Sequence, residues 1–206
     1  MARLTVGITG GIGSGKSYVC SMLRQYGIPV YDCDAEAKRL MAESEEIRSQ
    51  LDTLLDGEAY SYNADAQKYE LNKAAIANFL FASKQNASII NSIVHPVVKQ
   101  DFCSWAEQQT ADIAAQECAI LFESGFADTV DKTVEVYAPL ETRLQRAMKR
   151  DNASAQQVEA RMAQQMPEEE KRSIADYCII NDGAANLAEQ IESIISELGG
   201  QLTKEK

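Results

Sequence analysis

The chain has 206 residues, of which 45% are hydrophobic and 25% charged, as expected for a globular protein with a buried core. Its formal net charge of −11 argues against binding to nucleic acid or to a membrane surface, because like charges would repel. No apolar run reaches the roughly 18 residues of a membrane span. The five scattered cysteines contain no CxxC pair, which argues against a disulfide framework or a zinc site and favours a cytoplasmic location.

Five short apolar runs predict the buried strands of a parallel sheet, because turn or helix signals bound each run. The runs are Leu4–Thr9, Pro29–Asp32, Cys118–Phe122, Thr133–Tyr137 and Tyr177–Ile180. Helical patterns separate them, so strands and helices alternate along the chain. This alternation predicts an α/β fold built on an open five-stranded parallel sheet.

Glycines are expected to end two of the helices. Gly27 follows the first predicted helix, Ser17–Tyr26, in the position of a C-cap. The last predicted helix carries apolar residues at helical spacing from Leu187 to Leu198, and it is expected to stop at Gly199–Gly200. Residues 201–206 are then expected to form a frayed tail.

Two stretches between the predicted strands are longer than a normal crossover connection. The first runs from residue 35 to about 116; it contains no convincing strand, and its apolar spacing predicts two or three amphipathic helices. The second stretch, at about 141–171, predicts a charged helical hairpin. We therefore expect one domain over residues 1–206, with a core of 1–34, 117–140 and 172–200, a helical insert at about 35–116 and a helical lid at about 141–171.

The stretch TGGIGSGKSY at residues 9–18 matches the phosphate-loop pattern G-x-x-x-x-G-K-[ST] through Gly10, Gly15, Lys16 and Ser17. The glycines let backbone N–H groups turn towards a phosphate, and the following helix N-terminus adds its unpaired amides. The lysine can reach the outer phosphates, and the serine hydroxyl can bind Mg²⁺. The residues expected to bind the triphosphate are Gly11, Gly13, Ser14, Gly15, Lys16, Ser17 and Tyr18.

Three classes of phosphate-loop protein compete for this sequence: a small-molecule kinase, a GTP-dependent switch and a motor-type ATPase. The chain contains neither N-K-x-D nor D-x-x-G, the strings by which GTPases read guanine and sense the γ-phosphate. The run CAILFESG ends in the single acid Glu123, whereas motor ATPases usually carry an acidic pair. The small size and the two helical stretches favour a kinase.

Two acids follow the second predicted strand, in the sequence VYDCD. Side chains two residues apart in an extended strand face the same way, so Asp32 and Asp34 are expected to point together, at the sheet edge where such folds bind ligands. One carboxylate could accept a proton from an acceptor hydroxyl while the other holds a metal-bound water. The alternative is that Asp34 only caps a helix beginning at Ala35.

Three arginines, Arg143, Arg146 and Arg150, are spaced so that one helix face would present three guanidinium groups. Such a cluster can stabilise the charge of a transferring phosphoryl group, or it can simply be a solvated helix face. The only histidine, His95, precedes Pro96, and spacing alone favours a packed histidine at a helix break.

Taken together, the motifs resemble the dephospho-CoA kinase family, which catalyses the last step of coenzyme A synthesis. The resemblance runs from Leu4 to about Gly183 and rests on TGGIGSGKS, VYDCDAEAKRL, INSIVHP, LFESG, RLQRAMKRD and RMAQQMP…ADYCIINDG. It implies transfer of the γ-phosphate of ATP to the 3′-hydroxyl of the ribose of dephospho-CoA, with Mg²⁺. It also implies a P-loop kinase fold with a sheet core, a helical substrate-binding insert and a helical lid.

The resemblance also assigns roles to individual residues. The catalytic residues would be Asp34 as the base, with Lys16 and the lid residue Arg146. Arg150 and Asn181 would contact the nucleotide; Asp34, Lys38, His95 and Arg161 would contact the substrate; Ser17 and Asp32 would serve the metal. The sequence leaves open whether Asp32 or Glu123 completes the metal's water shell.

Four positions depart from the family's usual pattern: Tyr18 stands for Thr, Cys33 for Ala, Lys38 for Arg and Ala119 for Pro. Lys38 keeps the charge but lacks the two-pronged geometry of arginine. Two alternatives remain: a kinase for another nucleotide-like acceptor, and a nucleotide-sensing regulatory NTPase. We expect a monomer or a weak homo-oligomer.

Overall fold

The computed structural model describes residues 2–204, and the side chains of residues 2–200. The chain divides into two compact units: residues up to Asp32 together with those from Cys103 onward, and the intervening segment Cys33–Phe102. Within residues 2–204, none of the helices combines the length and the apolar character needed to cross a membrane.

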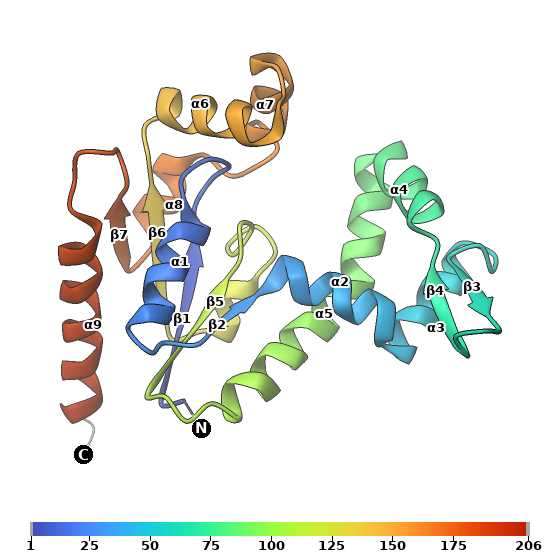
Figure 1. Cartoon of the computed structure of the whole chain (residues 1–206), viewed down its shortest axis with the longest axis horizontal. Helices are drawn as coiled ribbons and strands as arrows, with labels where there is room; N and C mark the ends of the chain where they lie inside the picture. The colour runs from blue at the N-terminus through green and yellow to red at the C-terminus, as the bar shows by residue number, and fades with distance from the viewer. Residues whose placement is uncertain (1, 205–206) are drawn as a thin grey trace. The chain divides into compact units, whose positions relative to one another are not determined.

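The first unit is built on a five-stranded sheet in which every neighbouring pair of strands is parallel (Figure 1). The strands, in spatial order, are β2 (Val30–Asp32), β5 (Ile113–Glu117), β1 (Leu4–Thr9), β6 (Lys132–Tyr137) and β7 (Tyr177–Ile180). The predicted α/β fold with a five-stranded parallel sheet is therefore confirmed. Because β1 is the central strand, the loop that follows it leaves the middle of the sheet's carboxyl edge.

The position predicted for the third strand in the chain is wrong. The strand is β5, Ile113–Glu117, and the apolar run Cys118–Phe122 is a turn that follows it. This turn is apolar because it packs onto the sheet: Leu121 is fully buried, and a Cβ placed on Gly7 of β1 would lie 2.8 Å from the Leu121 side chain. The true strand, IAAQE, is rich in small and polar residues, so its apolar signal was weaker than that of the turn.

Helices cover both faces of this sheet: α1 (Lys16–Gln25) and α9 (Leu187–Lys204) one face, and α8 (Glu168–Ile174) the other. The unit also contains α6 (Leu140–Asp151) and α7 (Ala155–Met162), which lie beyond the carboxyl ends of the strands (Figure 1), and a short 3₁₀ turn, Phe126–Thr129. The apolar stripes of α1 and α9 share one core with Val134 and Val136 of β6. Since side chains alternate along a strand, Glu135 of β6 faces the opposite side, where α8 packs.

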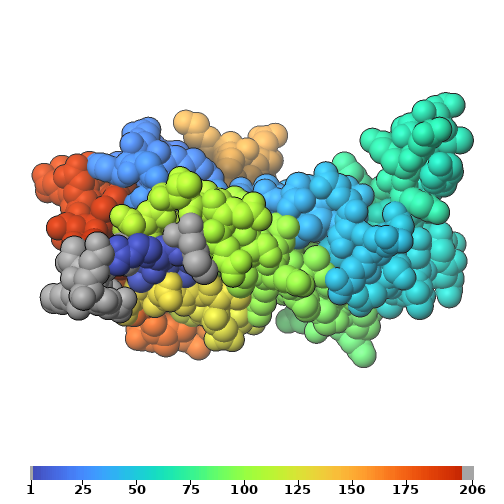
Figure 2. Space-filling view, turned by 90° about the horizontal axis from the view of Figure 1, so that it is seen from below, coloured from blue at the N-terminus to red at the C-terminus, as the bar shows by residue number. Residues whose placement is uncertain are grey.

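The end of the first helix lies where the sequence predicts it. Gly27 has a left-handed φ of 79°, and its N–H donates to the carbonyl of Arg24 at 3.1 Å, as glycines do just beyond a helix C-terminus. Figure 2 shows α9, in red, beside the blue residues of the α1 region. A hydrogen bond of 2.8 Å from Tyr26 Oη to Glu192 Oε1 joins the two helices.

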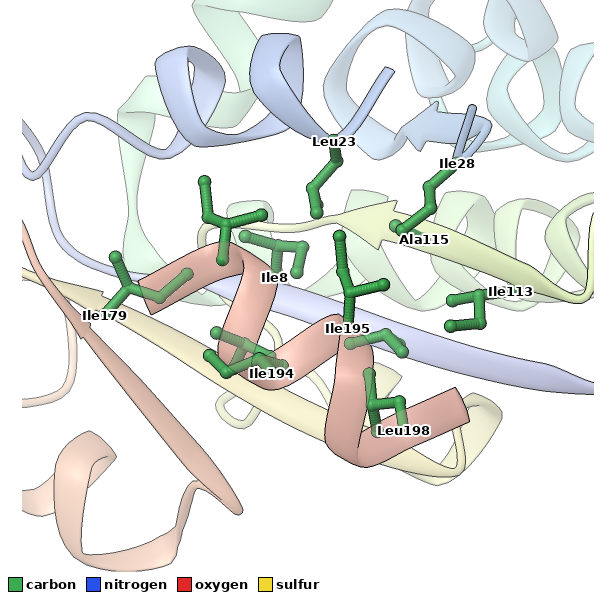
Figure 3. A pocket seen from close by; sticks show the side chains of 12 residues that line it. Ile8, Leu23, Ile28, Ile113, Ala115, Ile179, Ile194, Ile195 and Leu198 are labelled. Atoms are coloured by element: carbon green, nitrogen blue, oxygen red, sulfur yellow. The ribbon is translucent and has the colours of Figure 1, made fainter. Parts of the chain in front are cut away.

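The prediction that the last helix stops at Gly199–Gly200 is wrong, because α9 continues to Lys204. Glycine ends a helix by adopting a positive φ, and neither glycine does so here; as helical residues they cost only about 1 kcal/mol each relative to alanine. Residues 201–204 of the expected tail are thus helical, and residues 205–206 lie outside the described residues. A small apolar pocket remains between α9 and the sheet, beside Ala115 and Leu198 (Figure 3).

The second unit contains four helices rather than the two or three expected, and a hairpin that was not expected. Its elements are α2 (Cys33–Glu43), α3 (Glu45–Leu54), β3 (Tyr60–Asn63), β4 (Lys68–Leu71), α4 (Lys73–Ala82) and most of α5 (Lys84–Glu107). The predicted break at His95–Pro96 is wrong, since α5 continues through Pro96.

The strands β3 and β4 form an antiparallel pair, which contradicts the prediction that residues 35–116 contain no strand. Most of the hairpin's side chains are exposed, so the sequence lacks the apolar alternation that marks a strand. Two other features hold the hairpin. The rings of Tyr62 and Tyr69 pack edge to face with centroids 5.2 Å apart, and the Asn63 side chain accepts the N–H groups of Asp65 and Ala66 in the turn.

Candidate functional site

The predicted phosphate loop connects β1 to α1, and neighbouring elements pack closely against it. Gly13 and Gly15 have φ values of 80° and 95°, in the left-handed region that favours glycine. A Cβ on Gly13 would lie 2.2 Å from the carbonyl oxygen of Arg143 in α6, and one on Gly15 would lie 2.2 Å from Asn181 Nδ2. The pattern therefore needs glycine here both for the turn and for the approach of neighbouring chain segments.

Lys16 lies at the start of α1, and its Nζ donates to the carbonyl of Gly10 at 2.6 Å. The ammonium group is thus held over the loop. The Ser14 side chain is fully buried, while the ring of Tyr18 is 60% exposed, so the bulky residue points away from the core. Because it is the backbone of residue 18, not its ring, that belongs to the loop–helix junction, a tyrosine is accommodated there.

Ser17 faces an acid that the sequence analysis missed. Its Oγ donates to Glu117 Oε1 at 2.7 Å. Glu117 ends β5 and lies in register with Ile8 of β1 and with Asp32 of β2, so it stands between the two strands that were expected to carry the site. It was missed because the strand was placed over residues 118–122. An acid ending a strand beside the loop strand is the signal that correct strand bounds would have shown.

The oxygen atoms of Ser17, Glu117 and Asp32 are of the kind that Mg²⁺ prefers. Within residues 2–204, no group of three or more His, Cys, Asp or Glu side chains is arranged to hold a metal by itself. Mg²⁺ commonly binds through one or two protein oxygens, substrate phosphates and water. The side chains at this edge of the sheet therefore fit a Mg²⁺ ion that arrives with a polyphosphate.

Glu123, the other acid considered for the metal shell, has different partners. Its Oε1 accepts the N–H of Met166 at 2.9 Å and lies 3.1 Å from Lys171 Nζ. The structure therefore uses Glu123 to hold the segment that leads into α8. Of the two acids left open by the sequence, Asp32 is the one beside Glu117.

The argument that Asp32 and Asp34 share one face of a strand is wrong. Helix α2 begins at Cys33, so Asp34 lies in the first helical turn, and it is not the residue that precedes a helix starting at Ala35. Asp32 belongs to the first compact unit and Asp34 to the second. The two acids remain close along the chain, and Lys38 follows Asp34 by one helical turn.

His95 lies within α5 in the second unit and is half-buried. Burial, together with the charge of Lys99, lowers the pKa of its imidazole, which favours the neutral ring. In a neutral imidazole one ring nitrogen donates a hydrogen bond and the other accepts one, so either can bind a substrate group.

Arg146 and Asn181 are brought together at the phosphate loop. The Arg146 Nη1 atom donates to the carbonyl of Asn181 at 3.0 Å and to that of Ser14 at 3.5 Å. The Asn181 Nδ2 atom donates to the same Ser14 carbonyl at 2.7 Å. Helix α6, the end of β7 and the loop thus meet at one carbonyl, with a guanidinium group beside the loop.

The expectation that one face of α6 presents three guanidinium groups is wrong. Arg143 is only 9% exposed, and its Nη1 lies 3.8 Å from Glu168 Oε1. Its burial follows from the close packing of α6 against Gly13 of the loop.

Arg150 and Arg161 both bind Asp151 at the junction of α6 and α7. The N–O distances are 2.7 Å from Arg150 and 2.6 Å from Arg161. These hydrogen bonds lower the pKa of the Asp151 carboxyl. In the structure the two arginines therefore join α6 to α7, whereas Arg143 and Arg146 lie against the phosphate loop.

A buried acid on β6, Glu135, provides a prediction on stability. Glu135 is fully buried, and neither carboxyl oxygen has a hydrogen-bond partner within residues 2–204. Burial, and then repulsion by Glu168, raise the pKa of Glu135 to about 7 from 4.5, although Lys171, Arg172 and Arg143 oppose the shift. The carboxyl is thus protonated in the folded protein up to about pH 7, whereas in the unfolded chain it ionises near pH 4.5.

Its contribution to stability is therefore complete below pH 4.5 and is lost as the pH rises to about 7. Gln cannot ionise, so Glu135→Gln should increase the free energy of unfolding at pH 8 relative to its effect at pH 5, by on the order of 2 kcal/mol. Urea unfolding of both proteins at both pH values measures this difference. The same effect at pH 5 and pH 8 would show that Glu135 ionises normally.

Comparison with known proteins identifies the family. The dephospho-CoA kinase family model matches residues 4–186. A dephospho-CoA kinase from Bacteroides fragilis is 47% identical over 95% of this chain and 93% of its own length, and one from Porphyromonas gingivalis is 39% identical over 93% of each. The crystal structure of TT1252 from Thermus thermophilus superposes with a TM-score of 0.77 at 32% identity, covering 98% of this chain and 99% of that one. The chain belongs to the dephospho-CoA kinase family.

Proposed function

We propose that this protein transfers the γ-phosphate of ATP to the 3′-hydroxyl of the ribose of dephospho-CoA, giving coenzyme A and ADP. The observation that carries the proposal is the set of groups around the phosphate loop in a chain of this family. Lys16 and Ser17 lie at the start of α1, Glu117 receives the serine hydroxyl, and Arg146 donates to the loop's Ser14 carbonyl.

The donor half of the site holds the triphosphate of ATP. Backbone amides from Gly13 to Tyr18 surround the phosphates, while Gly11 lines the loop with its amide bound to Glu168, and the Lys16 ammonium exchanges its bond to the Gly10 carbonyl for the outer phosphates. Arg146 lies beside the loop, where a guanidinium group can stabilise the charge of the transferring phosphoryl group. Asn181 fixes the Ser14 carbonyl, and Arg150 contacts the nucleotide once ATP draws the lid over it.

Ser17 and Asp32, together with Glu117, would hold the metal. Mg²⁺ bound with ATP supplies positive charge that neutralises the β- and γ-phosphates. The Ser17 hydroxyl is oriented by Glu117 at 2.7 Å, and Asp32 and Glu117 are paired in register at the carboxyl ends of β2 and β5.

Four residues are proposed to act on the acceptor. Asp34 orients the ribose hydroxyl and accepts its proton, while Lys38, His95 and Arg161 bind the substrate. As a lysine, Lys38 offers one point charge rather than the forked donor of arginine. We further propose that the protein is cytoplasmic, which its scattered, unbonded cysteines support, and that it is a monomer or a weak homo-oligomer.

An ADP-release assay coupled to NADH oxidation tests the activity. Purified protein with ATP and Mg²⁺ should release ADP only when dephospho-CoA is added, and the product should co-elute with coenzyme A on a column. Release with other nucleotide-like acceptors alone would indicate a different kinase. Slow ADP release that no acceptor stimulates would indicate a regulatory NTPase.

A further inference from the structure

Two side chains, Gln165 before α8 and Glu168 at its first residue, bind backbone amides in the first half of the phosphate loop. The Ile12 N–H donates to Gln165 Oε1 at 2.9 Å, and the Gly11 N–H donates to Glu168 Oε2 at 3.3 Å. The partners are 153 and 157 positions apart in the sequence. Neither side chain is used by the phosphate-transfer scheme proposed above.

The residues around these two side chains are held by contacts with Glu123 and Ala119. Glu123 accepts the N–H of Met166 at 2.9 Å, and Lys171, which is fully buried, lies 3.1 Å from the same carboxylate and donates to the Ala119 carbonyl at 3.2 Å. The start of α8 is therefore tied to the turn that follows β5. These contacts hold the residues around Gln165 and Glu168 in a defined position.

Glu168 also contacts α6, because its Oε1 lies 3.8 Å from Arg143 Nη1. Both groups lie against Gly11 of the loop: a Cβ on this glycine would lie 2.5 Å from Glu168 Oε1 and 2.4 Å from Arg143 Nη1. The arginine offsets the carboxylate's negative charge, so the acid can lie beside an anion-binding loop without repelling a phosphate at full strength.

A glycine-rich loop can adopt many conformations, so fixing it around a phosphate costs conformational entropy. Hydrogen bonds that hold residues 11 and 12 before the ligand arrives reduce this cost. The amides expected to meet the phosphate are the later ones, from Gly13 to the start of α1. We propose that Gln165 and Glu168 are positioning residues that preorganise the phosphate loop for the donor nucleotide. The proposal rests on the proposed function only in taking a nucleoside polyphosphate as the ligand.

The first test is ADP affinity, measured by calorimetry with Mg²⁺ and without any acceptor. Gln165→Leu removes the acceptor for the Ile12 amide at similar size, and we expect it to weaken ADP binding about five- to tenfold, the effect of losing one such hydrogen bond. Gln164→Leu is the matched control: the neighbouring side chain is exposed, and ADP affinity should stay within about twofold, well inside the effect of a single hydrogen bond.

Glu168 gives a second, independent pair. Glu168→Gln keeps an oxygen for the Gly11 amide and should hold ADP affinity within about twofold, whereas Glu168→Ala should weaken it about five- to tenfold. Should Glu168→Ala fail to fold because Arg143 loses its partner, the Gln165 and Gln164 variants still decide the question.

Hydrogen–deuterium exchange of the unliganded protein separates positioning from general stability. In Gln165→Leu the peptide covering residues 10–18 should exchange faster while the peptides of the sheet do not, and the KM for ATP should rise without a change in the KM for the acceptor. Unchanged ADP affinity in a folded Gln165→Leu protein overturns the proposal, and tighter ADP binding does so too. Since calorimetry and exchange need no acceptor, a failure to phosphorylate dephospho-CoA leaves these outcomes interpretable.

Discussion

Asp34→Asn is expected to lower the turnover number by about 10² or more, the usual contribution of a general base. Asparagine keeps the size and the hydrogen-bonding ability of the side chain but cannot accept a proton from the ribose hydroxyl. ADP should therefore bind the variant with near wild-type affinity. Turnover is measured by the coupled ADP-release assay with dephospho-CoA, and nucleotide affinity by calorimetry.

Glu43→Gln is a suitable control for this experiment, because Glu43 lies at the other end of α2 and is exposed. Its turnover should stay close to the wild-type value. Near-normal turnover in Asp34→Asn would remove Asp34 from the chemistry. The result is informative because Asp34 lies in the first turn of α2 and not on the strand, so its assignment depends on its short distance along the chain from Asp32 and on the family pattern.

Arg146→Ala is expected to lower the turnover number by about 10² to 10³, comparable to the loss of a preorganised charge-stabilising group. The affinity for ATP should fall much less, because Lys16 and the loop amides still hold the triphosphate. The structure places this guanidinium within 3.5 Å of the Ser14 carbonyl, at the loop itself. Initial rates over a range of ATP concentrations separate the turnover number from the KM.

Lys149→Ala, on the exposed side of the same helix, controls for a general loss of positive charge. Its turnover number and its KM for ATP should stay close to the wild-type values. Arg146→Lys should recover only part of the lost rate, since an ammonium group cannot donate from two nitrogens at once. A loss of ATP affinity larger than the loss of turnover would recast Arg146 as a binding residue. That outcome would place its main role in the contacts with Asn181 and Ser14.

Features that depend on neighbouring residues along the chain were predictable from the sequence. The alternation of apolar runs with helical patterns indicated the five-stranded parallel sheet, and four of the five strands lie where those runs predict. The phosphate loop was predictable for the same reason: its glycines, Lys16 and Ser17 are fixed by one turn between a strand and a helix. Local backbone requirements leave a local pattern.

Features that depend on which distant segments meet were decided only by the tertiary structure. Glu117 is a partner of Ser17 because β5 ends at that residue. Arg143 is not part of an exposed arginine face because α6 packs on the loop. Gln165 and Glu168 reach Ile12 and Gly11 across more than 150 positions. Burial and long-range hydrogen bonds set these contacts, and neither leaves a periodic signal in the chain.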